Sequence, residues 1–209
     1  MKKAIYSVIT GGYDQINMIP NCEGWDQIMF TDLDVDSHLS WEIRKLPKSD
    51  NPLLQSRDIK IRSHVHLPEY DLVCYIDGNQ MLLKAPPNEP VWYTHTKRSN
   101  IFEEAQQIIR NGRFPAIIIN RQIGYYKAMG YNETGLYLNG FFVRNNKDEK
   151  INRLHDVWFT ETCRFTPRDQ LSLPFAMYLT GIEPENIQYP TEKENYAIIT
   201  KGHKQNYYL

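Results

Sequence analysis

The feature that most constrains the fold is a short apolar run that ends on a carboxylate. Residues 72–76 read Leu-Val-Cys-Tyr-Ile, and Asp77-Gly78-Asn79 follows directly. A run of this length, bounded by polar and turn residues, predicts a buried β-strand. In open α/β sheets the carboxyl ends of such strands border the ligand crevice. The sequence therefore predicts that Asp77 and Asn79 lie in a cleft.

Strand-like and helix-like segments alternate early in the chain, and helical segments dominate later. We expect strands at 4–10, 27–31, 41–46, 72–76, 91–94, 135–143 and 196–200. We expect helices at 53–66, 101–110, 116–129, 151–163 and 166–179. The last helix has a strong start signal, because Thr166 suits the N-cap, Pro167 the first turn and Asp169 the third position. This order predicts a three-layer α/β domain.

Length and composition limit the class of protein. The 209 residues fit a single domain, 1–209, and the 24 basic residues nearly balance the 25 acidic ones, so no global field favours nucleic acid or an anionic membrane. No stretch approaches the ~20 apolar residues of a membrane span, and the N-terminal run predicts a strand, not a signal peptide. Cys22, Cys74 and Cys163 are scattered. We therefore expect a cytoplasmic protein without a zinc framework, with peripheral membrane association left open.

Two motifs at the ends of early strands suit a nucleoside. Thr10-Gly11-Gly12-Tyr13 follows the first strand, where paired glycines let backbone amides approach a ligand and Tyr13 can stack on a base. Asp32 ends the next strand and can accept hydrogen bonds from a base or ribose. A plain turn and a strand-end cap are the respective alternatives.

A basic helix face is predicted after the third strand. Arg57, Lys60 and His64 recur at spacings of three and four, so one face presents two cations and an imidazole. Such a face can clamp a diphosphate or the Asp77 carboxylate. A solvated basic face is the alternative.

Asp77-Gly78-Asn79 also predicts a metal site. A divalent cation that bridges two phosphates takes hard oxygen ligands, and Asn79 offers an amide oxygen where a second acid would be expected. We expect Mn²⁺ or Mg²⁺, with His203 as a third ligand through a neutral imidazole. Because Asn79 lacks the negative charge of a second acid, metal-independent binding stays open. A strand-end turn is the structural alternative for the motif. For His203 the alternative is a solvent-exposed residue of the tail.

Two later segments carry further candidates. His95 and Arg98 lie at the join of a strand and a helix, where they can orient a donor phosphate or an acceptor hydroxyl, or merely form a charged helix start. Asp169 and Gln170 lie in the first turn of a helix, whose dipole keeps a carboxylate ionised. Asp169 can then act as a general base or hold the sugar and its developing positive charge; simple capping is the alternative.

These motifs follow one another over nearly the whole chain. The set comprises Thr10-Gly11-Gly12-Tyr13-Asp14, Phe30-Thr31-Asp32, Trp41, Arg57 with Lys60 and His64, Tyr75-Ile76-Asp77-Gly78-Asn79, His95 with Arg98 and Glu104, Trp158 and Arg168-Asp169-Gln170-Leu171-Ser172. Their order resembles that of the TOD/MUCI-type glycosyltransferase-like domain family.

The resemblance implies a single-domain GT-A-like, Rossmann-like α/β/α fold with a central mixed, mostly parallel sheet. In that fold Asp77-Gly78-Asn79 stands at the Asp-x-Asp metal motif. Asp169-Gln170 is similar to the Asp-Gln segment that contacts the donor sugar in retaining enzymes. His203 is similar in position to a C-terminal metal-binding histidine, although the motif around it is absent.

The expected function is transfer of a sugar from a nucleotide-diphospho-sugar, in particular a UDP-sugar, to a hydroxyl acceptor in glycan or surface polysaccharide synthesis. Residues 1–95 would bind the nucleotide and 96–209 the acceptor and sugar, with retention favoured over inversion. Expected donor contacts are Thr10, Gly11, Gly12, Tyr13, Asp32, Arg57, Lys60, His64, Asp77, Gly78, Asn79, His95 and Arg98; expected catalytic residues are Asp169 and Gln170; expected metal ligands are Asp77, Asn79 and His203.

Three alternatives stay open at this point. One is a non-catalytic nucleotide- or carbohydrate-binding module. A second is a ceramidase-like hydrolase, against which the chain offers neither a Cys/His cluster for a catalytic zinc nor an apolar lipid anchor. A third is transfer to a nucleic acid acceptor.

Overall fold

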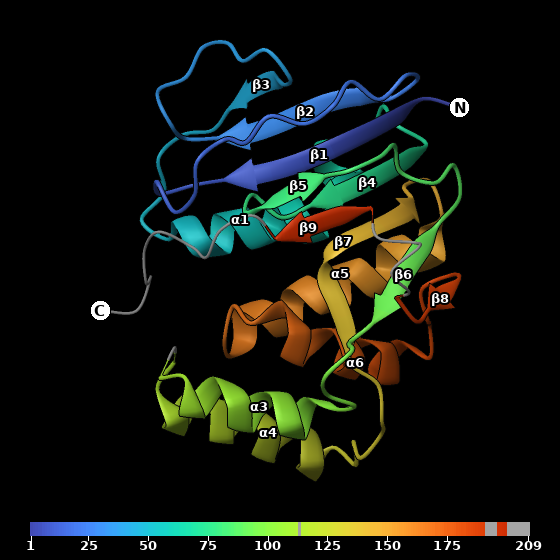
Figure 1. Ribbon diagram of the computed structural model, residues 1–209. Helices are drawn as coiled ribbons and strands as arrows, with labels where there is room; N and C mark the ends of the chain where they lie inside the picture. Colours follow the sequence, from blue (N-terminus) through green and yellow to red (C-terminus); the bar gives the residue numbers. More distant parts are fainter. Residues whose placement is uncertain (113, 191–195, 200–209) are drawn as a thin grey trace.

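The computed structural model describes residues 1–112, 114–190 and 196–199, and one mixed β-sheet forms its centre (Figure 1). Within these residues the sheet has seven strands in the order β3-β2-β1-β4-β7-β6-β8. The strands are β1 (Lys3–Ile9), β2 (Asp26–Thr31), β3 (Glu42–Lys45), β4 (Leu72–Ile76), β6 (Val91–Thr94), β7 (Tyr137–Asn145) and β8 (Ile187–Gln188).

The sheet is mostly parallel. β1 pairs in parallel with both β2 and β4, β2 with β3, and β6 with β8, whereas β7 runs antiparallel to its neighbours β4 and β6. All five residues of β4 are buried, as expected for a central strand that is covered on both faces. The predicted α/β class, with its mixed and mostly parallel sheet, is confirmed.

Helices cover one face of this sheet. They are α1 (Pro52–Ile61), α2 (Ser63–His66), α3 (Ile101–Arg110), α4 (Ala116–Ala128), α5 (Glu149–Arg164) and α6 (Asp169–Thr180). Side chains of α1, α5 and α6 pack on the sheet around Trp92, Phe142 and Trp158. The Trp92 and Phe142 rings stack with centroids 4.2 Å apart, and Trp158 meets Trp92 edge-on at 5.8 Å. This aromatic core fixes α5, and thereby α6, against the sheet.

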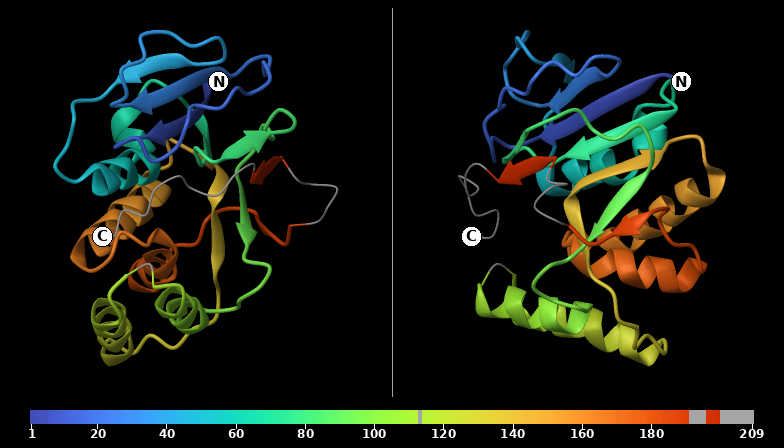
Figure 2. Two further views of the ribbon diagram at one scale, coloured as in Figure 1. Left: turned by 60° about the vertical axis from the view of Figure 1, so that its left-hand side comes forward. Right: turned by 45° about the vertical axis from the view of Figure 1, so that its right-hand side comes forward.

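The opposite face has a different cover. In the part of the chain that is described, loop residues between β1 and β2 and a two-stranded ribbon of β5 (Gln80–Leu82) and β9 (Ala197–Ile199) pack there. Tyr196, next to β9, stacks on Phe141 of the sheet with ring centroids 5.5 Å apart. Figures 1 and 2 show the ribbon on one side of the sheet and α1 on the other. The second helical layer expected from the sequence is therefore replaced by loops and a ribbon.

α3 and α4 form a hairpin beyond α6 (Figure 1). Their apolar side chains share a second core with α6, in which Tyr126 stacks on Phe175 with centroids 3.8 Å apart. This core holds the start of α6 from the side away from the sheet.

Two predicted helices differ from the observed ones. The helix expected at 53–66 is interrupted at Arg62, whose backbone angles of φ −101° and ψ 50° separate α1 from α2. The expected Thr166 cap is wrong, because its hydroxyl donates to Gln122 Oε1 (2.8 Å) and α6 begins only at Asp169. In the second case a buried side-chain partner outcompetes the local capping hydrogen bond.

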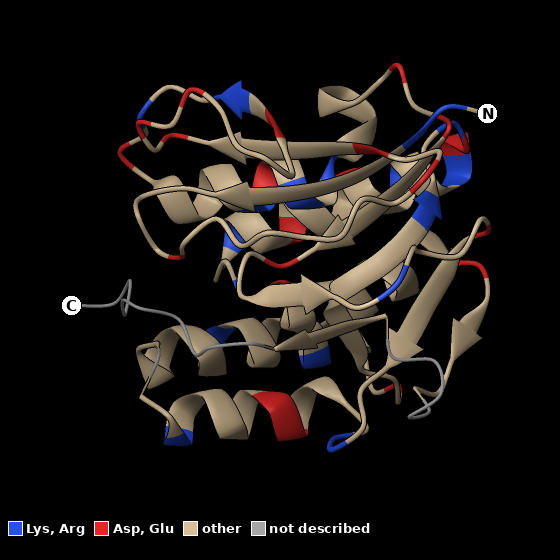
Figure 3. Cartoon of the chain, turned by 45° about the horizontal axis from the view of Figure 1, so that its top comes forward, with Lys and Arg blue, Asp and Glu red and all other residues tan. Residues whose placement is uncertain are grey.

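The surface charge and the character of the helices can also be compared with the composition. Basic and acidic residues are interspersed over the ribbon in Figure 3, in keeping with the near balance of charge. None of the helices among the described residues has both the length and the apolar character that crossing a membrane requires.

Candidate functional site

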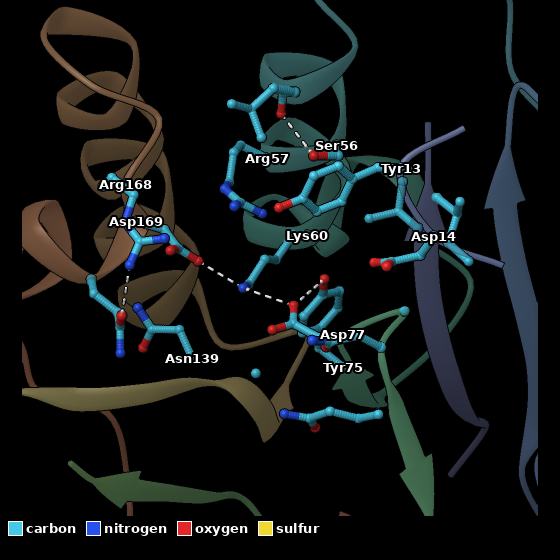
Figure 4. Close-up of a pocket in the computed structure, with 18 of the residues that line it drawn as sticks. Tyr13, Asp14, Ser56, Arg57, Lys60, Tyr75, Asp77, Asn139, Arg168 and Asp169 are labelled. Carbon is cyan, nitrogen blue, oxygen red and sulfur yellow. Dashed lines mark hydrogen bonds and ion pairs between the residues drawn. The ribbon is translucent and has the colours of Figure 1, made fainter. Parts of the chain in front are cut away.

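A cavity of about 570 Å³ opens where β1 and β4 end, with α1 and the start of α6 on its other side (Figure 4). Its size lies in the range of small-molecule sites. Ten of the predicted site residues line it: Thr10, Tyr13, Arg57, Lys60, Asp77, Gly78, Asn79, His95, Asp169 and Gln170. The structure thus brings the strand-end acid and the helix-start acid to one cavity, although they are far apart in sequence.

A buried lysine joins the two acids. The Lys60 side chain is only 3% exposed, and its Nζ lies 2.7 Å from Asp169 Oδ2 and 3.2 Å from Asp77 Oδ1 (Figure 4). The Tyr75 ring lies under the ammonium, with 4.8 Å between Nζ and the ring centroid. Tyr6 OH donates to the Lys60 carbonyl (2.6 Å) and fixes this turn of α1. The result is an ammonium bridging two carboxylates in a largely water-excluded place.

Asp77 is held by its own strand and by β7. Tyr75 OH donates to Asp77 Oδ1 (2.8 Å), and the Asp77 amide donates to the Gly140 carbonyl (2.8 Å). A Cβ on Gly140 would clash with Gln80 Nε2 and would lie 2.9 Å from Asp77 Oδ2. A larger residue at this position would therefore have to displace the Gln80 and Asp77 side chains. Gly140 was not predicted as a site residue.

Asp169 is ionised despite its burial. Burial alone would raise the pKa of its carboxyl, but Lys60 and, next, Arg57 outweigh that effect and lower the pKa to about 2. Its position in the first turn of α6 adds the favourable field of the helix N-terminus. Trp158 Nε1 donates to the Asp169 carbonyl (2.9 Å), so the aromatic core positions this residue directly.

This pKa shift predicts how stability depends on pH. The folded-state pKa of Asp169 is depressed from 3.8 to about 2, so its stabilising effect is complete above pH ~4 and is lost as the pH falls toward 2. The contribution is on the order of 2 kcal/mol at neutral pH. Urea unfolding of the wild type and Asp169→Asn should give a difference in unfolding free energy that shrinks between pH 7 and pH 3. A difference that stays constant would contradict the depressed pKa.

Asn139 and Arg168 also line the cavity, although neither was among the predicted site residues. Asn139 is 2% exposed and lines the cavity; its Oδ1 accepts from Trp92 Nε1 (3.4 Å), while its Nδ2 has no hydrogen-bond partner among the described residues. Arg168 Nη2 donates to Glu104 Oε1 (3.2 Å) and lies 3.5 Å from Gln170 Oε1. The available signal for Asn139 was a polar residue in the largely apolar stretch 136–143.

Other predicted residues lie elsewhere. Asp32 accepts the Gly11 amide with both carboxylate oxygens (2.9 Å each), and neither residue lines the cavity in the described part of the chain; the same is true of Gly12. His64 Nε2 lies 3.1 Å from Asp156 Oδ1, outside the cavity. The prediction that His64 shares one helix face with Arg57 and Lys60 is wrong, because the helix breaks before it.

Arg98 and His203 were also predicted to belong to the site. Arg98 lies outside this cavity and pairs through Nε with Glu104 Oε2 (2.5 Å). His203 lies outside the described residues.

The described residues do not fit a resident divalent cation. No three His, Cys, Asp or Glu side chains gather in the part of the chain that was placed. At Asp77 one carboxylate oxygen already receives both the Lys60 ammonium and the Tyr75 hydroxyl. A positive charge 3.2 Å from that oxygen opposes a second cation on it. The expected Mn²⁺ or Mg²⁺ stays a prediction.

The sequence matches a known protein family. The sequence model of the family TOD1/MUCI70, glycosyltransferase-like domain, matches residues 80–200, which is more than half of the chain. The matched range includes Asn139, Arg168 and Asp169, whereas Lys60 and Asp77 precede it. No curated protein shows a significant match to the sequence.

Proposed function

Because the chain belongs to the TOD1/MUCI70 family of glycosyltransferase-like domains, we propose that its cavity transfers a sugar from a nucleotide-diphospho-sugar, in particular a UDP-sugar, to a hydroxyl acceptor. The observation that carries this proposal is the Lys60 ammonium between Asp77 and Asp169 at the edge of the sheet. In this cluster the lysine would supply positive charge at the departing diphosphate. The carboxylates would supply negative charge at the sugar, which becomes positively charged in the transition state.

The donor would lie along the cavity from the first strand toward α6. Tyr13, which lies beyond the end of β1 and lines the cavity, would stack on the base. A lysine ammonium has three hydrogens, and Lys60 directs two contacts to the carboxylates. The third hydrogen, together with Arg57 on the same wall, would then bind the diphosphate oxygens.

The sugar would lie beside Asp169, Gln170 and the amide nitrogen of Asn139. In the transfer step, the bond between the anomeric carbon and the diphosphate oxygen breaks, and its electron pair stays on the diphosphate. The acceptor oxygen forms the new bond to that carbon, and its proton passes to the departing phosphate. The products are the glycoside and the nucleoside diphosphate.

The role of Asp169 in this step follows from its pKa. A general base works best with a pKa near the working pH, whereas that of Asp169 is lowered to about 2 by Lys60 and Arg57 against the effect of burial. Of the two roles open from the sequence, we therefore assign Asp169 the electrostatic one: it stabilises positive charge on the sugar. Retention of configuration stays the favoured outcome because Asp169-Gln170 resembles the Asp-Gln segment of retaining enzymes; the proton transfer written above would be consistent with it, since it keeps the acceptor on the face of the leaving group.

We assign charge neutralisation at the diphosphate to Lys60 and Arg57 in place of a divalent ion. Thermal melting with UDP and a panel of UDP-sugars, each with EDTA or with Mn²⁺, tests this assignment. A nucleotide at one hundred times its dissociation constant should raise the melting temperature by about 5–10 °C, with EDTA as well as with Mn²⁺. A melting shift that requires Mn²⁺ would indicate instead that an ion bound by Asp77 and Asn79 neutralises the diphosphate. No shift with any nucleotide would remove the donor site.

A further inference from the structure

A second cavity of about 520 Å³ shares His95 with the first, and we propose that it binds a saccharide as the sugar acceptor. It is formed by the segment after β6, the segment before β7, and Tyr189 after β8. The role of the ligand as the sugar acceptor rests on the proposed function of the first cavity. The choice of a saccharide rests on the lining of the second cavity alone.

His95 lines both cavities and is held by the residues that follow it. Its Nδ1 accepts the backbone amides of Lys97 (3.0 Å) and Arg98 (3.1 Å), and its Nε2 lies 3.1 Å from Arg98 Nη2. Burial and then the Arg98 charge lower the pKa of the imidazole, so the ring is neutral at pH 7. The contacts on both ring nitrogens fix the orientation of this neutral imidazole at the boundary between the cavities.

The walls of the second cavity are tied together. The His95 amide donates to the Leu136 carbonyl (2.7 Å), and the Gly135 amide donates to the Ser99 carbonyl (2.7 Å). Thr94 Oγ1 donates to the Gln188 carbonyl (3.4 Å), which anchors the segment that carries Tyr189. A cavity built from such cross-links is already in place before a ligand binds, and this lowers the entropic cost of binding.

Tyr189 offers a stacking surface at this cavity, because it is 64% exposed despite its anchored backbone. The remaining polar lining consists of the hydroxyl residues Thr94, Thr96, Ser99 and Thr134 and the charged residues Lys97, Arg98 and Glu103. Sugar rings combine hydroxyl edges with apolar C–H faces, so they use both hydroxyl partners and an aromatic surface.

The same lining disfavours the other acceptor classes. Leu136 is the one aliphatic side chain among the described residues of the lining, whereas an acyl chain needs a largely apolar wall. Arg98 is already paired with Glu104, and the negative charge of Glu103 offsets the positive charge of Lys97. The excess of basic groups that nucleic acid requires is therefore absent from this described set. The chemistry therefore points to a saccharide.

Saturation-transfer NMR tests this assignment. The probes are the methyl glycosides of glucose, galactose and N-acetylglucosamine, a short-chain ceramide and a single-stranded oligonucleotide, each with and without UDP. We expect at least one glycoside to receive saturation at its ring protons, and Tyr189→Ala to weaken its binding about fivefold. Tyr189→Phe, which keeps the ring, should retain binding. Leu39→Ala, at a side chain that is 93% exposed and remote in the sequence, serves as the matched control.

The outcomes separate this inference from the proposed function. The saccharide assignment is overturned if no glycoside binds, or if Tyr189→Ala and Leu39→Ala bind the glycoside equally well. It is also overturned if only binding of the ceramide or the oligonucleotide depends on Tyr189. The UDP-induced melting shift, measured on the same samples, reports the donor site separately. Its absence from the wild type would contradict the proposed function even where a glycoside binds through Tyr189.

Discussion

Asp169→Asn is expected to lower the rate of sugar transfer by a factor on the order of 10²–10³ while the protein stays folded. The substitution keeps the shape of the side chain but removes the negative charge that Lys60 and the first turn of α6 hold in the cavity. Because this charge acts on the transition state, the loss should fall on kcat more than on KM.

The rate is measured as nucleoside diphosphate released from a donor that binds the wild type, with a glycoside acceptor and with water alone. Asp36→Asn is the matched control, since its carboxylate is 94% exposed and forms a surface ion pair with Lys45 (3.6 Å). Surface pairs of this kind contribute little. Transfer by Asp169→Asn at the rate of Asp36→Asn would contradict the role given to Asp169.

Lys60→Met is expected to destabilise the fold by about 3–5 kcal/mol, because it leaves two carboxylates in the cavity without their shared cation. The Lys60 side chain is 3% exposed and Asp169 is 7% exposed, so water cannot replace the lost contacts without rearrangement. Methionine fills a similar volume, which separates loss of charge from loss of packing. Donor binding should be lost as well.

Urea unfolding at pH 7 measures this effect, with Lys48→Met as the control at an exposed lysine. The control should stay within about 0.5 kcal/mol of the wild type. The double variant Lys60→Met with Asp169→Asn should regain part of the lost stability, because one unpaired charge is gone. Equal effects of Lys60→Met and Lys48→Met would show that the bridging ammonium is not a structural element.

The sequence indicated the parts of the site that follow from local pattern. The apolar run of β4 predicted that Asp77 reaches a cleft, and helix spacing predicted that Arg57 and Lys60 can meet it. Both rules depend only on which way side chains point from a regular element. The predicted contact between Lys60 and Asp77 is present, and the binding of a diphosphate by the same lysine stays a prediction.

The remaining features depend on tertiary contacts that a local pattern does not contain. His64 leaves the cavity because the backbone breaks at Arg62, and the Thr166 hydroxyl binds Gln122, which is 44 residues away. Asn139 and Gly140 matter because β7 passes beside the turn after β4. The ribbon over the second sheet face pairs Gln80 with Ile199, a contact that no periodicity signals.

A crystal structure of the complex with UDP, grown in EDTA, tests the central claim most directly. The account predicts the diphosphate in the first cavity, with phosphate oxygens within hydrogen-bond distance of Lys60 Nζ and the Arg57 guanidinium and the base against Tyr13. A nucleotide bound away from Lys60, or a protein that binds UDP only through a divalent ion on Asp77, would contradict it.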